Sequence, residues 1–230
     1  MKDRIKVIAF DADDTLWDNQ PQFDEVIDEF CEILSPFCPS ETALRAIHKT
    51  QVVNIPVYGF GAKSLTLSMT QTACELSDYR IDAKSVERII NLGKKLLTMP
   101  VELLDSAEEV LSELQGKYKL LVITKGDLID QKRKLAQSGV ERFFDHIEVL
   151  NDKKAADYSH LFKRLTINPG EFAMVGNSLK SDIIPVLELG AHAIYIPYHC
   201  TWEHEEVDSY DPYHKNLLEV EKLKDLLKVF

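Results

Sequence analysis

The stretch Ile5-Lys6-Val7-Ile8-Ala9-Phe10-Asp11-Ala12-Asp13-Asp14-Thr15 decides the fold of this chain. The run from Val7 to Phe10 is apolar and stops abruptly at an acid, which is the pattern of a short, buried β-strand. Residues two apart on an extended chain point to the same side, so Asp11 and Asp13 can face one crevice. Such a pair fits an acidic surface turn, but two adjacent carboxylates repel each other unless a cation or a reaction needs them. The buried strand in front favours a site, because the carboxyl ends of strands in an open α/β sheet are where ligands bind.

The composition indicates a globular cytoplasmic protein without a nucleic-acid or membrane partner. The chain has 230 residues, of which 45% are apolar and 28% charged, and its net charge is −11. That sign is wrong for binding nucleic acid or an acidic membrane. The four cysteines include no C-x-x-C pair, which is typical of a reducing compartment. No apolar run approaches membrane-spanning length.

Short apolar runs alternate with helical patterns in the second half of the chain. We predict further strands over residues 120–123, 146–150, 172–175 and 193–196. We predict helices over residues 127–138, over 158–165 and up to Leu187, the last of which ends at Gly190. This alternation predicts right-handed βαβ units and a Rossmann-like α/β core with a mostly parallel sheet. The segment from Leu217 to Leu227 has the pattern of an amphipathic helix.

The interval from Trp17 to Met99 breaks this alternation. It shows helical periodicity and no convincing strand. We therefore predict an all-helical domain over residues 17–99, inserted into a catalytic core formed by residues 1–16 and 100–230.

Polar residues stand at the ends of four predicted strands, and parallel strands bring those ends to one edge of the sheet. They are Asp11 with Asp13, then Thr124, then Lys153, then Asn177 with Asp182. These residues match four sequence motifs in order: D-x-D-x-T at Asp11, S/T at Thr124, K at Lys153 and G-D/N-x-x-x-x-D from Gly176 to Asp182. The chain therefore resembles the haloacid dehalogenase-like hydrolase superfamily, and its helical insertion resembles the C1-type cap of that family.

The resemblance implies a role for each catalytic residue. Asp11 is the nucleophile that forms an aspartyl-phosphate, and Asp13 is the general acid and base. Thr124 and the backbone amide of Lys125 hold the phosphoryl group. Lys153 balances the charge, and the neighbouring Lys154 is the alternative for this role.

The resemblance also implies Mg²⁺ as the cofactor. Its ligands would be Asp11, the backbone carbonyl of Asp13, Asn177 and Asp182. Asn177 stands where such phosphatases often have Asp, so it supplies an oxygen without a charge and binds the metal directly or through water. The alternative for Asn177 is a turn after Gly176.

Asp13 indicates the type of reaction within the family. Haloacid dehalogenases and phosphonoacetaldehyde hydrolases lack a carboxylate two residues after the nucleophile, whereas an alkoxide leaving group needs an acid there. The sequence therefore predicts a Mg²⁺-dependent hydrolase of small phosphate monoesters. The alternatives are a phosphomutase of the same family and a catalytically silent phosphate-ligand-binding or interaction protein.

Substrate contacts are predicted from position alone. Trp17 and Asp18 follow the catalytic loop, and Lys63 ends the cap's glycine-rich stretch Tyr58–Lys63, which fits either a substrate-contacting loop or an ordinary turn. A cap that closes over its substrate favours a small phosphorylated metabolite. The segment from His199 to His204 fits no standard metal site and is expected at the crevice rim. The sequence leaves open whether the protein is a monomer or a homodimer.

Overall fold

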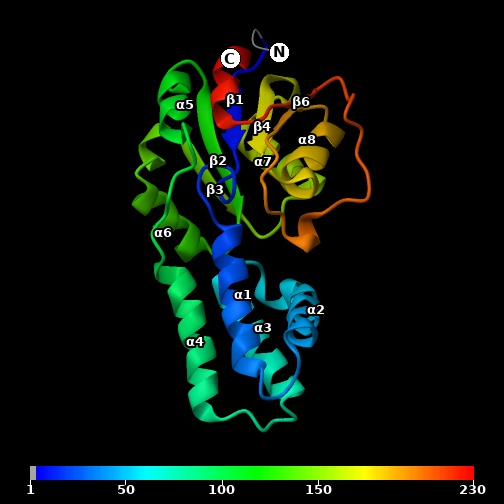
Figure 1. The fold of residues 1–230 in the computed structure, drawn as a ribbon. Helices are drawn as coiled ribbons and strands as arrows, with labels where there is room; N and C mark the ends of the chain where they lie inside the picture. The colour runs from blue at the N-terminus through cyan, green and yellow to red at the C-terminus, as the bar shows by residue number, and fades with distance from the viewer. Residues whose placement is uncertain (1–3) are drawn as a thin grey trace. The chain divides into compact units, whose positions relative to one another are not determined.

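Residues 4–230 are described by a computed structural model, and across them six strands form one parallel sheet (Figure 1). The strand order is β3-β2-β1-β4-β5-β6. The strands are β1 Val7–Phe10, β2 Lys119–Lys125, β3 His146–Leu150, β4 Phe172–Gly176, β5 His192–Tyr195 and β6 Leu217–Glu219. β1 lies in the middle, where Val7 pairs with Lys119 of β2 on one side and with Phe172 of β4 on the other. The predicted Rossmann-like α/β core is confirmed.

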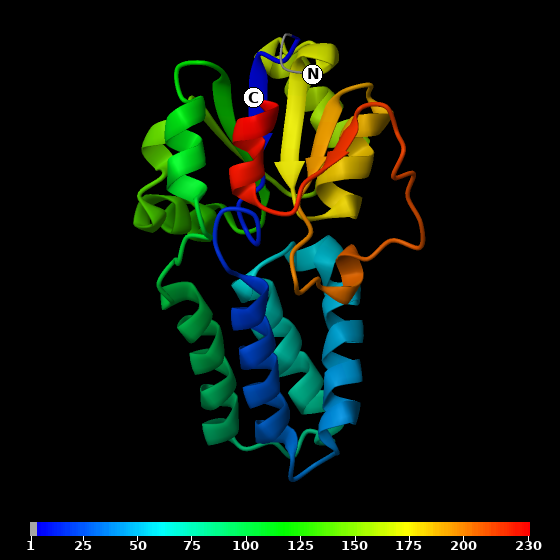
Figure 2. The same ribbon diagram turned by 45° about the horizontal axis from the view of Figure 1, so that its top comes forward.

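Helices cover both faces of the sheet (Figure 2). Alternate residues of β1 serve the two faces: Ile8 and Phe10 pack into one core, and Val7 and Ala9 into the other. The first face is covered by α5 (Ala107–Leu114), α6 (Leu128–Ser138) and the C-terminal α9 (Leu226–Val229). The second is covered by α7 (Ala155–Leu165), a π-helical turn (Leu179–Ile183) and α8 (Ile184–Glu188). Because every residue of β1 is buried, its pattern is a continuous apolar run rather than an alternation.

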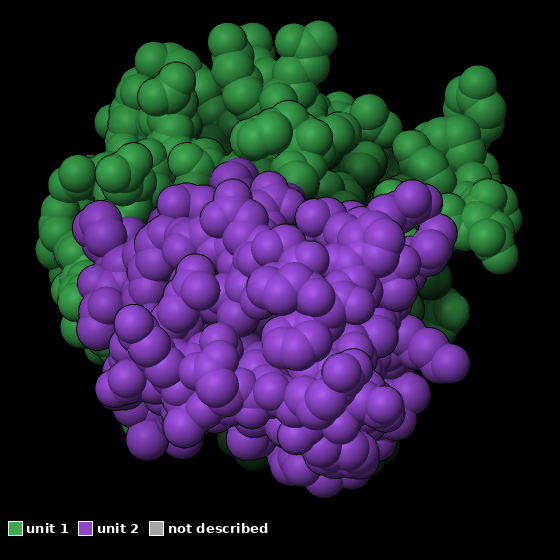
Figure 3. Space-filling view, turned by 60° about the horizontal axis from the view of Figure 1, so that its bottom comes forward, with its two compact units in different colours: residues 1–20, 101–125, 131–230 green, residues 21–100, 126–130 purple. Residues whose placement is uncertain are grey.

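The chain divides into two compact units, coloured separately in Figure 3. The first holds the sheet and comprises residues up to Gln20, Val101–Lys125 and Gln131–Phe230; the second comprises Pro21–Pro100 and Gly126–Asp130. The second unit contains α1 (Gln20–Leu34, which begins at the boundary), α2 (Ser40–Tyr58), α3 (Ala62–Leu76) and α4 (Ala83–Thr98). These helices enclose a core of their own that includes Phe30, Ile47, Leu65, Met69 and Ile89.

Within residues 4–230, no helix is long and apolar enough to cross a lipid bilayer.

The prediction of a helix over residues 217–227 is wrong. Leu217–Glu219 forms the edge strand β6, in which Leu217 pairs with Ala193 of β5. A 3₁₀ turn at Leu223–Asp225 and the short α9 follow. Over such a short span, adjacent apolar residues fit both the helical period and the strand alternation. The segment forms a strand because the edge of β5 offers its backbone hydrogen-bond partners.

Candidate active site

The polar residues predicted to converge lie where neighbouring strands end. β1 runs into Asp11, whose backbone N–H donates to the carbonyl of Val175 on β4 at 2.9 Å. On the other side of β1, Thr124 is buried at the end of β2. This local geometry follows from the parallel pairing, which brings the carboxyl ends of β1, β2 and β4 to one edge.

Lys153 lies between two of the predicted carboxylates. Its ammonium contacts Oδ1 of Asp11 and lies 2.7 Å from Oδ1 of Asp182. The side chain of Lys153 is only 1% exposed. Lys154, the alternative, is exposed and pairs with Asp152 at 2.8 Å. The lysine that reaches both carboxylates is therefore Lys153.

Burial and charge set the protonation of this group. Burial, opposed by Lys153 and assisted by the nearby charge of Asp182, raises the pKa of Asp11 to about 7. Burial disfavours the charge on Lys153, but the carboxylates of Asp11 and Asp182 outweigh burial and raise the pKa of the lysine above its usual value. One lysine thus serves two buried carboxylates, and it leaves one negative charge uncompensated when both are ionised.

Hydrogen bonds within the turn that carries Asp182 fix its position. It is fully buried, and its Oδ2 accepts the backbone N–H of Ser178 at 3.0 Å. The backbone N–H of Asp182 in turn donates to the carbonyl of Ser178 at 2.8 Å. Gly176 leaves space for this carboxylate, because a Cβ there would lie 2.3 Å from Oδ2 of Asp182.

Asp13 is held by three donors. Oδ1 accepts from the Trp17 indole N–H at 2.7 Å and from the Lys134 ammonium at 2.6 Å, and Oδ2 accepts from the Gln131 amide at 2.9 Å. Burial raises the pKa of Asp13, but Lys134, helped by the Gln131 and Trp17 hydrogen bonds, outweighs burial and leaves the pKa below its ordinary value. These contacts fix the rotamer of the carboxylate and hold it ionised.

Sequence reasoning did not identify Gln131 and Lys134. They lie three residues apart on α6, so they share one face of the helix. Gln131 also donates to Oγ1 of Thr124 at 2.7 Å, which links the two predicted phosphate-handling residues Asp13 and Thr124. The available signal was this i, i+3 pair of polar residues in the helix that follows Thr124.

Two predicted substrate contacts have partners within the first unit. Trp17 is 1% exposed, and its indole points to Asp13; the structure gives it the role of positioning Asp13, since so little of its surface is open to a substrate. The Asp18 carboxylate accepts the hydroxyl of Tyr198 at 2.5 Å. The adjacent Asp14 accepts the backbone N–H groups of Asn19 and Gln20 at 2.8 and 2.9 Å, and so caps α1.

The two predicted substrate-binding lysines are each paired with an acid. The Lys125 ammonium lies 2.6 Å from Glu205, and Lys63, in the second unit, lies 3.0 Å from both oxygens of Asp127. Glu205 is a site-edge residue that sequence reasoning missed, because it stands in an irregular segment without a periodic pattern.

The residues present fit a hard divalent cation. Asp11 and Asp182 supply carboxylate oxygens, Asn177 an amide oxygen and Asp13 a backbone carbonyl, which are donors that Mg²⁺ prefers. Oδ1 of Asn177 accepts from Oγ1 of Thr15 at 3.1 Å, which orients the amide oxygen. The uncompensated carboxylate charge beside Lys153 is what a cation would neutralise. Within residues 4–230, no cluster of three or more His, Cys, Asp or Glu side chains forms a metal site by itself, so the amide and carbonyl donors are needed.

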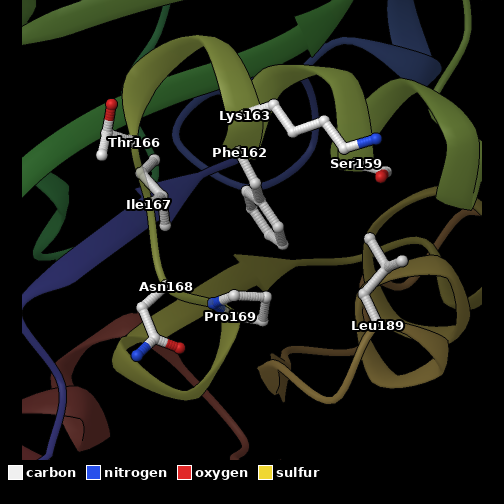
Figure 4. A pocket seen from close by; sticks show the side chains of 8 residues that line it. All are labelled: Ser159, Phe162, Lys163, Thr166, Ile167, Asn168, Pro169 and Leu189. Carbon is white, nitrogen blue, oxygen red and sulfur yellow. The ribbon is translucent and has the colours of Figure 1, made fainter.

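An apolar hollow at the other edge of the sheet is separate from this site (Figure 4). It is formed by the connection from α7 to β4 and by the end of α8. Both lie at the amino-terminal ends of the strands. Its lining residues are Ser159, Phe162, Lys163, Thr166, Ile167, Asn168, Pro169 and Leu189. None of these is a carboxylate, so the hollow offers none of the predicted chemistry.

Comparisons with known proteins agree with this architecture. The crystal structure of a haloacid dehalogenase-like family hydrolase from Xanthomonas campestris is 33% identical, covers 98% of this chain and 90% of its own, and superposes with a TM-score of 0.87. N-acylneuraminate-9-phosphatase of Mus musculus is 26% identical over 202 residues, which is 83% of this chain and 81% of the relative. The magnesium-bound structure of the putative HAD-hydrolase YfnB from Bacillus subtilis shares the fold, with 19% identity, a TM-score of 0.68 and 98% of each chain covered. The model of the haloacid dehalogenase-like hydrolases matches residues 5–190, and the chain belongs to that family.

Proposed function

We propose that this protein is a Mg²⁺-dependent phosphatase that hydrolyses phosphate monoesters of small metabolites through an aspartyl-phosphate on Asp11. The observation that carries the proposal is the contact of one buried lysine, Lys153, with both Asp11 and Asp182. A lysine in this place opposes the effect of burial on the pKa of the nucleophile and offsets the repulsion between its carboxylate and a phosphate anion. Phosphoryl transfer depends mainly on such positioning and charge neutralisation.

In the first step, an oxygen of Asp11 attacks phosphorus, and the bond between phosphorus and the ester oxygen breaks. The leaving oxygen takes a proton from Asp13 and departs as an alcohol. Asp13 is ionised before substrate binds, but an approaching phosphate anion raises its pKa because like charges favour the neutral acid. The hydrogen bond from Gln131 to Thr124 keeps the acid and the predicted phosphate-binding hydroxyl in one network.

In the second step, Asp13 acts as the base. It takes a proton from water, whose oxygen attacks phosphorus, and the bond between phosphorus and Asp11 breaks. Inorganic phosphate leaves, the Asp11 carboxylate is free again, and Asp13 releases to solvent the proton it took from water, because its pKa in the free protein lies below the ordinary value. The Lys134 and Trp17 contacts favour the ionised form of Asp13 that this step requires.

Asp11, Asp182, Asn177 and the carbonyl of Asp13 would hold Mg²⁺, which when bound neutralises phosphate charge and orients the ester. The structure of YfnB, which has the same fold, is bound to magnesium, and this supports the choice of cation.

Small phosphorylated metabolites are the proposed substrates. The relative N-acylneuraminate-9-phosphatase is named for such a phosphate ester. The first compounds to assay are therefore N-acetylneuraminate 9-phosphate and a panel of sugar, triose and nucleotide phosphates.

The test measures phosphate release from this panel with Mg²⁺ and with EDTA. We expect turnover that needs Mg²⁺ and falls by at least about 1,000-fold in Asp11→Asn, because the nucleophile is lost. No turnover above the Asp11→Asn background with any ester would refute the proposal. A phosphorylated protein that releases its label only when a second hydroxyl compound is added would identify a phosphomutase instead.

A further inference from the structure

The segment between β5 and β6 brings an acidic side chain to the active-site edge. Glu205 lies in this segment, 80 residues along the chain from Lys125. Its Oε1 accepts from the Lys125 ammonium at 2.6 Å, and its Oε2 accepts from the hydroxyls of Ser178 and Ser181 at 2.5 Å each. The Lys125 ammonium also donates to Oγ of Ser181 at 2.8 Å, which closes the network. All four groups belong to the first unit.

This network is buried and its charges are matched. The side chains of Lys125 and Glu205 are 15% and 13% exposed, and both serines are buried. Burial raises the pKa of Glu205, but Lys125 and the two serine hydroxyls outweigh it and bring the value down to about 2. A buried carboxylate with three donors has little freedom to move, because its hydrogen bonds are lost if it leaves.

The partners of Glu205 adjoin the residues assigned to chemistry. Ser178 and Ser181 belong to the turn that carries Asp182: Oγ of Ser178 accepts the backbone N–H of Ser181 at 3.0 Å, and the Ser178 N–H donates to Asp182. Lys125 directly follows Thr124 on β2. One carboxylate therefore ties the end of β2 to the turn after β4.

The segment is anchored at two further points. The ammonium of Lys180 donates to the carbonyl of His204, next to Glu205, at 2.5 Å. The Tyr198 hydroxyl donates to Asp18 at 2.5 Å. These contacts hold Glu205, the last residue of a short 3₁₀ turn (Glu203–Glu205), at the edge of the site.

We infer that Glu205 is a positioning residue of the phosphoryl-transfer site, which fixes the Ser178–Asp182 turn and the end of β2 so that Asp182 and Thr124 keep their working places. The inference rests on the proposed function. It assigns to the β5–β6 segment a part in catalysis that the strand-end motifs do not contain.

The experiment compares Glu205→Gln with Glu206→Gln. Both variants remove one negative charge, from adjacent residues, but Glu206 is exposed. For Glu205→Gln we expect kcat and the affinity for Mg²⁺ in the activity assay each to fall about 10–100-fold, as for other residues that orient metal-site ligands. We expect KM for the phosphate ester to change less than about threefold, since the residue touches no substrate. Glu206→Gln should match the natural protein.

A second readout does not need turnover. Mn²⁺, another hard cation that prefers oxygen ligands, is titrated and followed by electron paramagnetic resonance. Glu205→Gln should raise its dissociation constant about 10–100-fold, and Glu206→Gln should leave it unchanged. If Glu205→Gln does not fold, Ser181→Ala replaces it; it removes one donor to Glu205 and should shift the Mn²⁺ constant in the same direction by about threefold to tenfold.

The outcomes separate the two proposals. An active natural protein whose Glu205→Gln variant keeps its kcat and its Mn²⁺ constant would overturn the inference and leave the phosphatase proposal standing. A natural protein that hydrolyses no ester, but whose Mn²⁺ constant still depends on Glu205, would refute the phosphatase proposal and support the positioning role. A change limited to thermal stability, with kcat and metal affinity intact in the folded variant, would reduce Glu205 to a structural residue.

Discussion

Gly176 and Asp182 are packed so closely that no other residue fits at position 176. A Cβ there would lie 2.3 Å from Oδ2, 2.4 Å from Cγ and 2.6 Å from Cβ of Asp182. Asp182 cannot give way easily, because it is fully buried and bonded to Lys153 and to the N–H of Ser178. The glycine at the end of β4 is thus required for space rather than for an unusual backbone angle.

Replacement of Gly176 by alanine should therefore disable the site. We expect Gly176→Ala to cost about 1–3 kcal/mol of unfolding free energy, as overpacked cores do, and to lower kcat/KM about 10–100-fold because Asp182 is displaced. Denaturant unfolding and the phosphatase assay measure both. Gly170→Ala is the control, because a Cβ there would meet only Oδ1 of Asn168, at 3.6 Å; equal behaviour of the two variants would contradict the packing argument.

Lys153 and Lys154 give a matched pair of variants at adjacent positions. Lys153→Met leaves the buried Asp11 and Asp182 without their cation, so we expect a loss of about 3–5 kcal/mol in stability and of at least about 100-fold in kcat. Lys154→Met removes an exposed ion pair and should change stability by less than about 1 kcal/mol. Equal losses in the two variants would show that Lys153 is not the lysine that serves the nucleophile.

The strands of the sheet could be predicted where burial on both faces leaves a continuous apolar run. Val7–Phe10 was identified in this way with its observed bounds. His146–Leu150 was also identified with its observed bounds, although its residues are only partly buried and include His146 and Glu148. Leu217–Glu219 could not be predicted in this way, because three residues do not define a period and their partner, β5, is remote in sequence until the sheet forms.

The residues of the candidate site likewise fall into those that could be predicted from the sequence and those that could not. Residues that immediately follow a strand, such as Asp11 and Asn177, could be predicted because parallel pairing alone places them at one edge. Side chains that reach the edge from elsewhere could not. Trp17 was expected to face substrate, but only tertiary packing turns its indole inward to Asp13, and Glu205 depends on a long irregular connection.

The ion pair between Lys134 and Asp13 should matter most for esters with a poor leaving group. Lys134→Met removes a donor to Asp13 and loosens the acid that protonates the departing oxygen. We expect kcat/KM to fall about 10–100-fold for an alkyl phosphate, whose alkoxide needs that proton, and less than about threefold for 4-nitrophenyl phosphate, whose phenolate leaves unaided. Lys132→Met, at an exposed position of the same helix, is the control. Equal losses of kcat/KM on both esters would show that Lys134 does not act through protonation of the leaving group.

Glu205 should make stability depend on pH in acid. Its pKa is about 2 in the folded protein against an ordinary 4.5, so folding favours the carboxylate. Its contribution is complete above about pH 5 and disappears as the pH falls towards 2. The shift corresponds to a contribution of the order of 3 kcal/mol. The difference in unfolding free energy between the natural protein and Glu205→Gln, measured with denaturant from about pH 7 down to about pH 3, should therefore shrink as the pH falls. Glu206→Gln should show no such trend. A difference that stays constant across this range would mean that Glu205 stabilises the fold by packing and neutral hydrogen bonds, and not through its charge beside Lys125.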